Sequence, residues 1–382
     1  MMRLLVTGAA GFLGQRLVMQ ALARGHRVVA VVRPGRDLAG LAWAGKADVE
    51  VVRLDLASES AVDALGLLLA AGEGGGEGEG TVVIHAAGSL SGDDAMQQRD
   101  SIEPTRRLIN AMRDATRDAM HRVGCRRLVL ISSLSVYGYA ALPTGAQLDE
   151  TTPTEPEPTQ RDAYCRAKLA QEGLALEAAQ LHGLVVTALR PGMIFGPGRW
   201  WSARLGIAKG PLGFILGGAA ALPLCHVDHC AAAALLAAER PSHAGDVFVA
   251  PDASGHCGAF EVINVIDDVQ PSQRAYLAML RRHVAGMPSL VVRLPWGLLR
   301  RLAGLASLVA LAVPPLHTRL PGLLRPASLH ARCKPLRFSN CRLHDRLGWR
   351  PSVAWEEAIA EAGKTDGKDR GERLMGETDG RS

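Results

Sequence analysis

The chain has few aromatic residues, and its charges are not segregated by sign. Aromatic side chains make up 4% of the 382 residues, and the 43 lysines and arginines are interspersed with 38 aspartates and glutamates. A nucleic-acid-binding surface usually combines a basic stripe with stacking aromatic residues. We see no such stripe, so the sequence argues against a nucleic-acid partner, and the net charge of +5 adds little.

The sequence also lacks a regular cysteine framework and an apolar run of membrane-spanning length. Its 7 cysteines are odd in number and irregularly spaced, which does not fit a disulfide scaffold. The apolar stretch from Leu302 to Val313 is too short to cross a bilayer core of about 30 Å. Because the first predicted strand begins almost at Met1, we expect no cleavable segment before it. We therefore expect a cytoplasmic protein.

The start of the chain carries its strongest signal. An apolar run from Leu4 to Val6 predicts a buried parallel strand, and Gly8, Gly11 and Gly14 follow it at regular intervals. Glycine lets the backbone turn tightly against a ligand, and the next helix directs its positive N-terminus at a phosphate. With a second predicted strand at Arg27–Val32, this is the βαβ setting of a dinucleotide-binding turn.

The end of the second strand bears on which dinucleotide is used. Enzymes specific for NAD often place an acid there, whereas this chain has Arg33, which can pair with a 2′-phosphate. We therefore predict NADP as the preferred cofactor, with NAD as the alternative if Arg33 is an ordinary solvated charge. A third strand, Val49 to Leu54, places Asp55 and Leu56 to close the adenine pocket.

The next segments predict further strands and helices of the same sheet. Residues 70–80 form a glycine- and glutamate-rich flexible insert. A fourth strand, Thr81 to His85, runs into three small residues that let the chain pass close to the cofactor: Ala86, Ala87 and Gly88. A long amphipathic helix follows over residues 102–123, and then a fifth strand from Arg127 to Ile131.

A serine after the fifth strand and a tyrosine–lysine pair form the predicted catalytic group. Tyr164 and Lys168 stand four residues apart in a predicted helix over 161–181, so they share one face. A phenol of pKa about 10 becomes useful near neutral pH when an ammonium group and an oxidised nicotinamide lower that pKa. Ser133 is predicted to hold the substrate oxygen while Tyr164 exchanges its proton and hydride moves to or from the nicotinamide.

Together these motifs resemble an extended short-chain dehydrogenase/reductase, the group that includes the NAD-dependent epimerase/dehydratase and 3β-hydroxysteroid dehydrogenase families. The resemblance covers residues 3 to about 361 and rests on Thr7–Gly14, Asp55, His85–Gly88, Ser133, Tyr164 and Lys168, Arg190–Gly198, and Leu347–Pro351 followed by Trp355–Ala358. It implies an α/β fold with a doubly wound parallel Rossmann sheet and a second, smaller, discontinuous α/β lobe. It also implies cofactor contacts at Phe12, Leu13 and Pro191.

The resemblance further implies a domain plan. Residues 1–190 would form the dinucleotide-binding domain, 191–362 the substrate lobe, and 363–382 a disordered tail. Related enzymes often dimerise through the helices that correspond to 102–123 and 161–181, so a homodimer is one expected partner state.

Several positions depart from the family pattern. Ser101 stands where an asparagine is usual, and Pro104 where a glycine is usual. The segment Cys225–Cys230 resembles the family's His-Val-Asp-Asp motif, with His229 in place of the second acid. Its histidines and cysteines lie where a strand enters a helix and cannot all converge, so we expect no metal site.

The departures also help to decide which of the family's activities this chain has. Dehydratases carry an Asp-Glu pair where this chain has Leu134 and Ser135. Many nucleotide-sugar epimerases have an arginine where this chain has Leu222, although other basic residues could substitute: Arg199, Arg204 or Lys209. The apolar stretch from Trp200 to Leu224 suits an apolar substrate, unless it is ordinary core of the second lobe.

We therefore predict an oxidoreductase that interconverts a secondary alcohol and a ketone on a mainly apolar, steroid- or lipid-like substrate. The alternatives are a nucleotide-sugar epimerase with a tightly bound dinucleotide and a catalytically idle cofactor-sensing scaffold. The apolar segment 296–316 would either cover the substrate pocket or rest on a membrane surface beside Arg300, Arg301 and Arg319.

Overall fold

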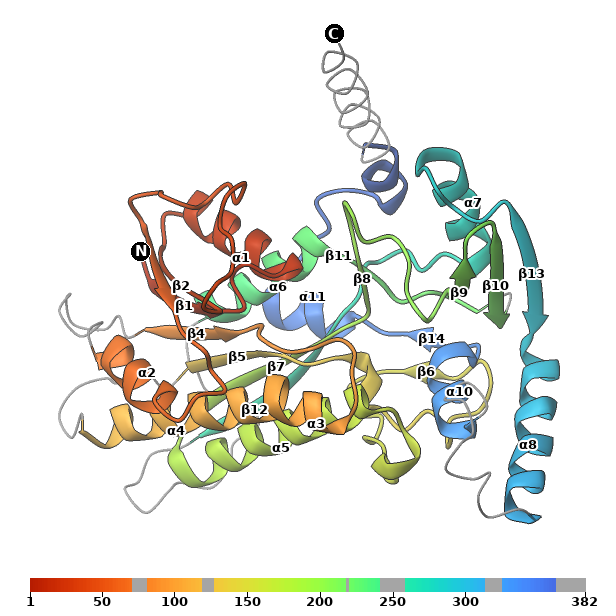
Figure 1. The fold of residues 1–382 in the computed structure, drawn as a ribbon, viewed down its shortest axis with the longest axis horizontal. Coiled ribbons are helices and arrows are strands. Elements are labelled where there is room, and N and C mark those ends of the chain that lie inside the picture. Colours follow the sequence, from red (N-terminus) through yellow and green to blue (C-terminus); the bar gives the residue numbers. More distant parts are fainter. Residues whose placement is uncertain (71–80, 119–126, 218–219, 241–257, 313–324, 362–382) are drawn as a thin grey trace, which may run out of the picture.

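The computed structural model describes residues 1–70, 81–118, 127–217, 220–240, 258–312 and 325–361. A seven-stranded parallel sheet forms its centre, with the order β12-β7-β5-β4-β1-β2-β3 (Figure 1). The seven strands are β1 (Arg3–Thr7), β2 (Arg27–Val32), β3 (Val49–Arg53), β4 (Val82–His85), β5 (Arg127–Ile131), β7 (Val185–Pro191) and β12 (Ala259–Val265). This confirms the predicted α/β fold with a doubly wound parallel sheet.

The composition of the strands explains their position. β1, β2 and β4 consist mostly of leucine, isoleucine and valine and are buried on both faces, as strands of a covered parallel sheet must be. β1 pairs with β2 on one side and with β4 on the other, so the direction of winding reverses beside β1. Ligands of open α/β sheets bind in the crevice at the carboxyl ends of such strands.

Helices cover both faces of the sheet (Figure 1). One layer consists of α1 (Phe12–Ala23), α6 (Val227–Glu239) and α11 (Cys341–Leu347), which share one hydrophobic cluster with the sheet. The other layer consists of α2 (Ala61–Ala70), α4 (Glu103–Asp118) and α5 (Ala163–His182), which share a second cluster. The sheet is therefore held between two apolar layers.

The residues after β7, together with β6 from the loop after β5, add smaller sheets beside the carboxyl edge of the main sheet. Their strands pair as a three-stranded sheet and two two-stranded sheets, namely β13 (Leu290–Pro295), β10 (Leu212–Gly217) and β9 (Gly206–Lys209); β11 (Leu224–His226) and β8 (Met193–Phe195); and β14 (Arg337–Phe338) and β6 (Gln147–Leu148). The accompanying helices are α7 (Gln273–His283), α8 (Trp296–Ala312) and α10 (Pro326–Cys333). A third cluster around Phe195, Trp200 and Tyr276 forms the core of this region.

Several predicted boundaries differ from the structure. The helix predicted from residue 102 begins as α4 at Glu103, and α3 (Asp94–Gln97) and a π-helical turn (Gln98–Ile102) precede it. α5 begins after Asp162, whose side chain accepts a hydrogen bond from the Cys165 amide, and ends at Gly183 in a left-handed conformation.

Some predicted features cannot be compared with the structure. The end of the predicted helix at 119–123, residues 71–80 of the insert and the tail 363–382 lie outside the described residues. The division at residue 190 stays a prediction, and β12 and α6, which follow it in the chain, pack with the central sheet.

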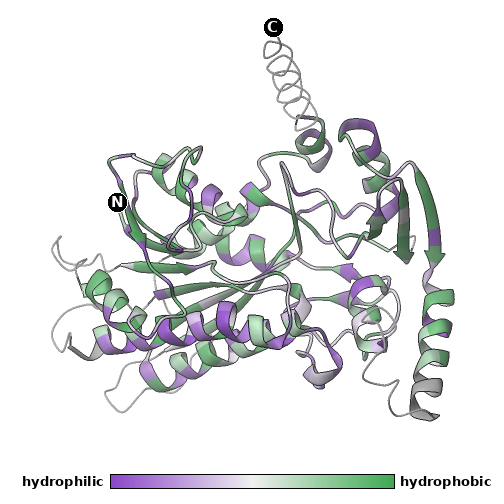
Figure 2. Cartoon of the chain, in the orientation of Figure 1, coloured by the Kyte–Doolittle hydropathy of each residue, from purple (hydrophilic) through white to green (hydrophobic). Residues whose placement is uncertain are grey.

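The distribution of hydropathy follows these layers (Figure 2). Apolar residues concentrate in the central strands, while polar residues recur along the outer faces of α4 and α5. Within the described residues, no helix combines the length and the apolar character needed to cross a bilayer.

Candidate active site

The glycine turn between β1 and α1 leaves no room for side chains. Gly8 has a φ of +70°, and a Cβ on it would lie 2.9 Å from the Ala86 carbonyl oxygen. A Cβ on Gly14 would lie 2.1 Å from the Gly8 carbonyl oxygen, so this residue lets the helix pack directly on the turn. Gly11 is the N-cap of α1 and has no side chain to cap it, which leaves the helix N-terminus open to an anion.

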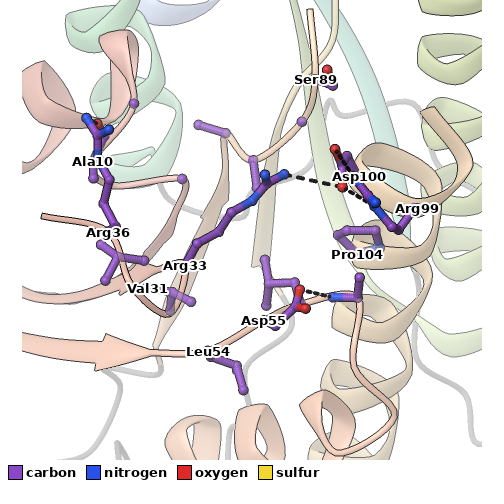
Figure 3. A pocket seen from close by; sticks show the side chains of 18 of the residues that line it. Ala10, Val31, Arg33, Arg36, Leu54, Asp55, Ser89, Arg99, Asp100 and Pro104 are labelled. Carbon is purple, nitrogen blue, oxygen red and sulfur yellow. Dashed lines mark hydrogen bonds and ion pairs between the residues drawn. The ribbon is translucent and has the colours of Figure 1, made fainter. Parts of the chain in front are cut away.

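A cavity of about 440 Å³ lies over this turn, at the carboxyl ends of β1, β2 and β3 (Figure 3). Eight of the predicted cofactor residues line it, namely Gly8, Gly11, Arg33, Asp55, Leu56, Ala86, Ala87 and Gly88. The open helix end, the close-packed glycines and the size of the cavity fit a dinucleotide that binds through its pyrophosphate.

The other predicted cofactor residues near the turn lie outside the cavity lining. Gly14 and Leu13 are buried against the core, where they set the packing of α1. The ring of Phe12 lies beneath the Arg199 guanidinium, 5.5 Å from its carbon. At Leu13 and Gly14 only the backbone at the start of α1 is left to contact a ligand.

Three arginines and an aspartate surround the outer part of the cofactor cavity (Figure 3). Arg33 forms an ion pair with Asp100 at 3.5 Å, and Arg99 forms one with the same carboxylate at 2.9 Å. The hydrogen bond from Arg99 and the charge of Arg33 lower the pKa of Asp100. Arg36 donates a hydrogen bond to the Ala10 carbonyl oxygen at 3.4 Å, beside the glycine turn. Sequence reasoning singled out Arg33 and missed Arg36, although both flank the same proline–glycine turn after β2.

A second cavity of about 290 Å³ contains the predicted catalytic hydroxyls. Ser133 and Tyr164 line it together with Pro191, and Leu90 lines both this cavity and the cofactor cavity. Ser133 follows β5 and accepts a hydrogen bond from the Ser135 amide at 3.1 Å, which holds its side chain at the start of a short helical turn. Burial raises the pKa of Tyr164, and a hydrogen bond with Ser133 and the charge of Arg199 act in the opposite direction.

Lys168 lies behind the tyrosine rather than in the open cavity. Its Nζ donates a hydrogen bond to the Ile131 carbonyl oxygen at 2.8 Å and lies 5.9 Å from the centre of the Tyr164 ring. Burial lowers the pKa of Lys168 to about 8, and the charge of Glu172 opposes this shift. The structure thus brings Ser133, Tyr164 and Lys168 to one place at the carboxyl end of β5.

Glu172 anchors this arrangement, and sequence reasoning missed it. It lies one turn beyond Lys168 on α5 and accepts hydrogen bonds from the Arg190 guanidinium at 2.9 and 2.6 Å, as well as one from the Ser132 hydroxyl. Arg190 stacks over the ring of Tyr137 at 4.5 Å. This buried pair joins α5, β5 and β7, so it fixes the positions of Tyr164 and Lys168 relative to Ser133.

The two departures from the family pattern have a local structural role. The Ser101 hydroxyl accepts a hydrogen bond from the Ser89 amide at 3.0 Å and donates one to Gln97, so it holds the loop after β4. Pro104 lines the cofactor cavity at the start of α4. The π-helical turn between α3 and α4 carries Ser101, and such turns often occur at functional sites.

Beneath the cofactor cavity, a buried polar chain contains His85. Its ring nitrogens contact the Thr7 hydroxyl at 2.7 Å and the Thr105 hydroxyl at 2.9 Å. The Gln171 amide donates to the same Thr105 oxygen at 2.6 Å. Burial, together with the nearby charge of Lys168, lowers the pKa of His85 to about 3. The histidine is therefore neutral and links β1, β4, α4 and α5.

The second cavity is more cationic than the sequence suggests. Four arginines line it, namely Arg161, Arg199, Arg204 and Arg332. Arg161 is buried in an ion pair with Glu155 at 2.8 Å, and Arg332 pairs with Asp162 at 3.0 Å. Within the described residues, Arg199 forms no ion pair. The Ser328 hydroxyl, which is buried at the same cavity, has no hydrogen-bond partner there.

The apolar residues between Trp200 and Leu224 mostly lie elsewhere. Leu205, Ile215 and Leu222 belong to the core of the smaller sheets, and Ile207 is exposed on β9. None of these four residues lines the cavity with Tyr164, and three of them are ordinary core of the second lobe. Of the basic residues proposed to replace the missing arginine, Arg199 and Arg204 reach the cavity and Lys209 does not.

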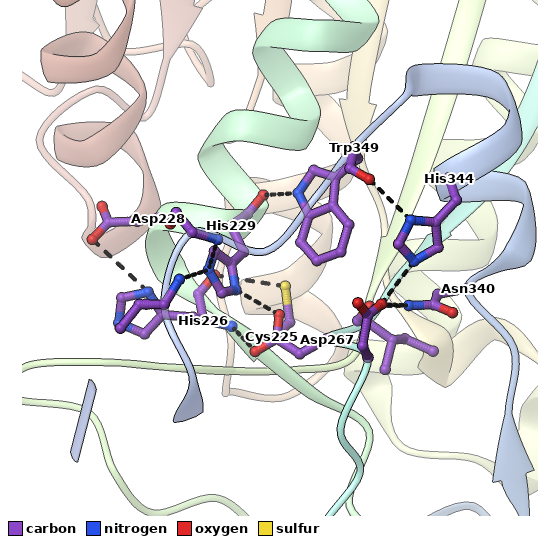
Figure 4. A network of polar contacts seen from close by, with 12 residues as sticks. Cys225, His226, Asp228, His229, Asp267, Asn340, His344 and Trp349 are labelled. Atoms are coloured by element: carbon purple, nitrogen blue, oxygen red, sulfur yellow. Dashed lines mark hydrogen bonds and ion pairs between the residues drawn. The ribbon is translucent and has the colours of Figure 1, made fainter. Parts of the chain in front are cut away.

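The segment Cys225–Cys230 forms a hydrogen-bond network (Figure 4). His229 contacts an Asp267 carboxylate oxygen at 2.8 Å, and its other ring nitrogen accepts a hydrogen bond from the Ser352 amide at 3.0 Å. The second oxygen of Asp267 accepts from the His226 amide at 3.0 Å. Among the described residues, no group of three histidines, cysteines or acids is placed to hold a metal ion. The network ties α6 to the segment before Trp355.

The sequence matches a known protein family. The sequence profile of the NAD dependent epimerase/dehydratase family matches residues 4–250. A cinnamoyl-CoA reductase of Oryza sativa subsp. japonica is 34% identical over 197 residues, which are 50% of this chain and 53% of that protein. A 3-diazoavenalumate denitrifying reductase of a Streptomyces species is 34% identical over 253 residues, 62% of this chain and 72% of that protein. The chain thus spans about half the length of the rice relative.

Solved structures of low sequence identity share the fold. The UDP-glucose 4-epimerase of Thermus thermophilus in complex with NAD is 20% identical, with a TM-score of 0.62 over 95% of this chain and 98% of that one. The UDP-glucuronic acid 4-epimerase of Bacillus cereus in complex with UDP-glucuronic acid and NAD is also 20% identical, with a TM-score of 0.63 over 95% and 99%.

Proposed function

The chain belongs to the NAD dependent epimerase/dehydratase family of NAD(P)-dependent extended short-chain dehydrogenases/reductases, and from that premise we propose that it interconverts a secondary alcohol and a ketone. One observation carries the proposal. Ser133 and Tyr164 line one cavity, with the Lys168 ammonium behind the phenol, and this cavity shares Leu90 with the cofactor cavity over the glycine turn.

In this proposal each side chain has a defined task. Ser133 binds and orients the substrate oxygen, and Tyr164 gives its proton to that oxygen in ketone reduction or takes one from the alcohol in the reverse direction. Lys168 stabilises the phenolate by its charge and holds the cofactor ribose. When bound, the nicotinamide supplies or accepts the hydride. The raised pKa of Tyr164 keeps the phenol protonated at neutral pH, which suits reduction.

We also propose that NADP is preferred to NAD. Arg33 and Arg36 both reach the adenosine side of the cofactor cavity, at the end of β2, and their charges suit a 2′-phosphate. The competing Asp100 carboxylate is already paired with Arg99, so Arg33 is free to turn from it toward a phosphate.

The cavity lining changes our expectation of a mainly apolar substrate. Leu134, Met193 and Ile194 contribute apolar side chains to its wall, and the charge of Arg199 acts on Tyr164. Arg332, which pairs with Asp162, and the Ser328 hydroxyl, which has no hydrogen-bond partner among the described residues, enter the wall from α10. We therefore propose a substrate that combines an apolar part with an anionic group, a carboxylate or a phosphate.

The test is NADPH oxidation with pairs of ketones that differ only by a terminal carboxylate or phosphate. We expect the anionic member of each pair to be reduced with the higher kcat/KM and to lose about tenfold in the Arg332→Gln variant, as removal of one charge-assisted hydrogen bond implies. Equal kcat/KM within every pair would contradict the proposed substrate class.

A nucleotide-sugar epimerase is the second candidate. The same arginines favour it, because a nucleoside diphosphate is also an anion, and the two solved epimerases share the fold. An epimerase recycles its dinucleotide without net consumption. Purified protein that retains the dinucleotide and oxidises no NADPH with any ketone would support this candidate, whereas any hydride transfer would exclude an idle cofactor-sensing scaffold.

We further propose a homodimer through the outer faces of α4 and α5. Both helices lie on the same side of the sheet (Figure 1), and α5 exposes Leu176 and Leu181. Light scattering of the purified protein and of its Leu181→Glu variant tests this interface.

The cytoplasmic location stays a prediction. The cysteines that the structure describes are free thiols.

A further inference from the structure

The outer face of α8 is apolar and has no partner within the described part of the chain. Leu298, Leu302 and Leu305 are exposed to 44%, 46% and 61%. Their spacing of four and three residues places them on one side of the helix. The opposite side is packed, because Leu299 and Ala303 contact a cluster with Leu329 of α10. Over residues 296–305, α8 therefore has a packed side with Leu299 and Ala303 and an outer stripe with the three exposed leucines.

The neighbouring strand extends this surface. Among the described strands, β13 pairs with β10 alone, and it leads directly into α8, so both elements follow one edge of the molecule (Figure 1). Leu290 is 63% exposed on this strand, and Val292 is exposed as well. Figure 2 shows apolar residues along both elements at this edge. We call the five exposed apolar residues and the arginines among them the β13–α8 face.

The charge of the β13–α8 face is positive and uncompensated. Arg293, Arg300 and Arg301 are exposed beside the leucines and form no ion pair with any described carboxylate. The whole segment from residue 269 to residue 344 has twelve lysines and arginines and no aspartate or glutamate. This local excess is hidden in the nearly balanced total charge of the chain.

Leucines and unpaired arginines together select one kind of partner. A second copy of this face would bring like charges together, and a nucleic acid would leave the leucines without a binding site. An anionic lipid surface accepts both, because the leucines enter the acyl boundary while the arginines contact the headgroups. α8 has 17 residues, about 25 Å of helix, which suits a helix that lies in the interface.

We propose that the β13–α8 face docks the protein on an anionic membrane surface. The face lies next to the substrate cavity, because α10 packs Leu329 and Cys333 toward α8 and contributes Ser328 and Arg332 to the cavity. Docking would therefore bring the mouth of that cavity close to the lipid headgroups. This proposal does not depend on the reaction that the site performs.

The test is sedimentation of the full-length protein with vesicles of phosphatidylcholine alone and of phosphatidylcholine mixed with phosphatidylserine. We expect binding to the mixed vesicles that weakens with added salt. Leu302→Ser together with Leu305→Ser should reduce the partition coefficient at least tenfold. Neutralising Arg300 and Arg301 to glutamine should reduce it about fivefold for each charge.

Matched controls come from another part of the surface. Leu67→Ser with Arg27→Gln changes an exposed leucine and an exposed arginine on α2 and β2, and it should leave vesicle binding unchanged. Circular dichroism and NADPH binding in solution check that every variant is folded. Absence of binding to the mixed vesicles, equal binding to the neutral ones, or equal losses in the control would overturn the proposal. So would lipid-independent self-association that the leucine variant abolishes.

Discussion

The Lys168 Nζ lies 5.9 Å from the centre of the Tyr164 ring and is tied to β5 by its 2.8 Å hydrogen bond to the Ile131 carbonyl oxygen. The amine cannot move away from the phenol without breaking that bond. Its charge therefore acts on Tyr164 from a fixed position, and the protonation of Lys168 should govern both cofactor binding and the pKa of the phenol.

The lowered pKa of Lys168, about 8, predicts a pH dependence of cofactor binding. Below this pH the ammonium attracts the anionic dinucleotide, and as pH rises through about 8 the charge is lost. We expect the Kd for NADPH to increase over this range in the wild-type protein. Fluorescence titration of Lys168→Met should show a weaker affinity without this step, and an unchanged step in the variant would assign the titration to another group.

The arginines at the end of β2 predict the cofactor preference. Replacing Arg33 and Arg36 together by alanine should raise the KM for NADPH by about two orders of magnitude, because two charge-assisted contacts to the phosphate are lost. The KM for NADH should change little. Arg27→Ala, an exposed arginine at the other end of β2, is the matched control. Equal effects on both cofactors would show that neither arginine reads the 2′-phosphate.

A side chain at position 14 should destabilise the fold, because Gly14 packs directly on the glycine turn. A Cβ there would lie 2.1 Å from the Gly8 carbonyl oxygen, so Gly14→Ala must push α1 away from β1. We expect a loss of about 3 kcal/mol in the free energy of unfolding and a large loss of NADPH affinity. Gly66→Ala on α2, where a Cβ meets nothing within 4 Å, should instead gain about 0.5 to 1 kcal/mol. Denaturant unfolding with and without NADPH measures both effects.

His85 predicts sensitivity to acid. Its pKa is about 3 in the folded protein and 6.5 ordinarily, so the unfolded chain takes up a proton first as the pH falls below 6.5. The stability that comes from keeping His85 neutral is therefore fully present above pH 6.5 and is lost as the pH falls. At about pH 5 the free energy of unfolding is lower by about 2 kcal/mol. His85→Gln should be less stable at neutral pH but should lose less stability on acidification. Urea unfolding of both proteins at the two pH values provides the comparison.

The sequence was sufficient for the parts of the fold that local chemistry dictates. The glycine turn and the strands beside it follow from short-range patterns. Only glycine fits at position 8, because a side chain there would meet the backbone of Ala86, and only apolar residues fit a sheet that is covered on both faces. The same holds for Tyr164 and Lys168, whose spacing along one helix determines their common face.

The rest of the site depends on contacts between distant segments. Arg332 reaches the cavity only because α10 packs across from Ser133, and nothing near Arg332 in the sequence signals this. Glu172 on α5 anchors the site through Arg190, which comes from β7. The apolar stretch before Leu224 suggested a substrate pocket because sequence alone cannot separate a pocket wall from a core; the structure assigns it to the core.

The central claim is that Tyr164 exchanges the proton in hydride transfer between the cofactor and a ketone. The most direct measurement is single-turnover oxidation of NADPH by wild-type protein and by Tyr164→Phe with the best ketone of the anionic series. We expect the rate to fall about 10³-fold or more in the variant, with the Kd for NADPH unchanged. A variant that reduces the ketone at the wild-type rate would contradict it.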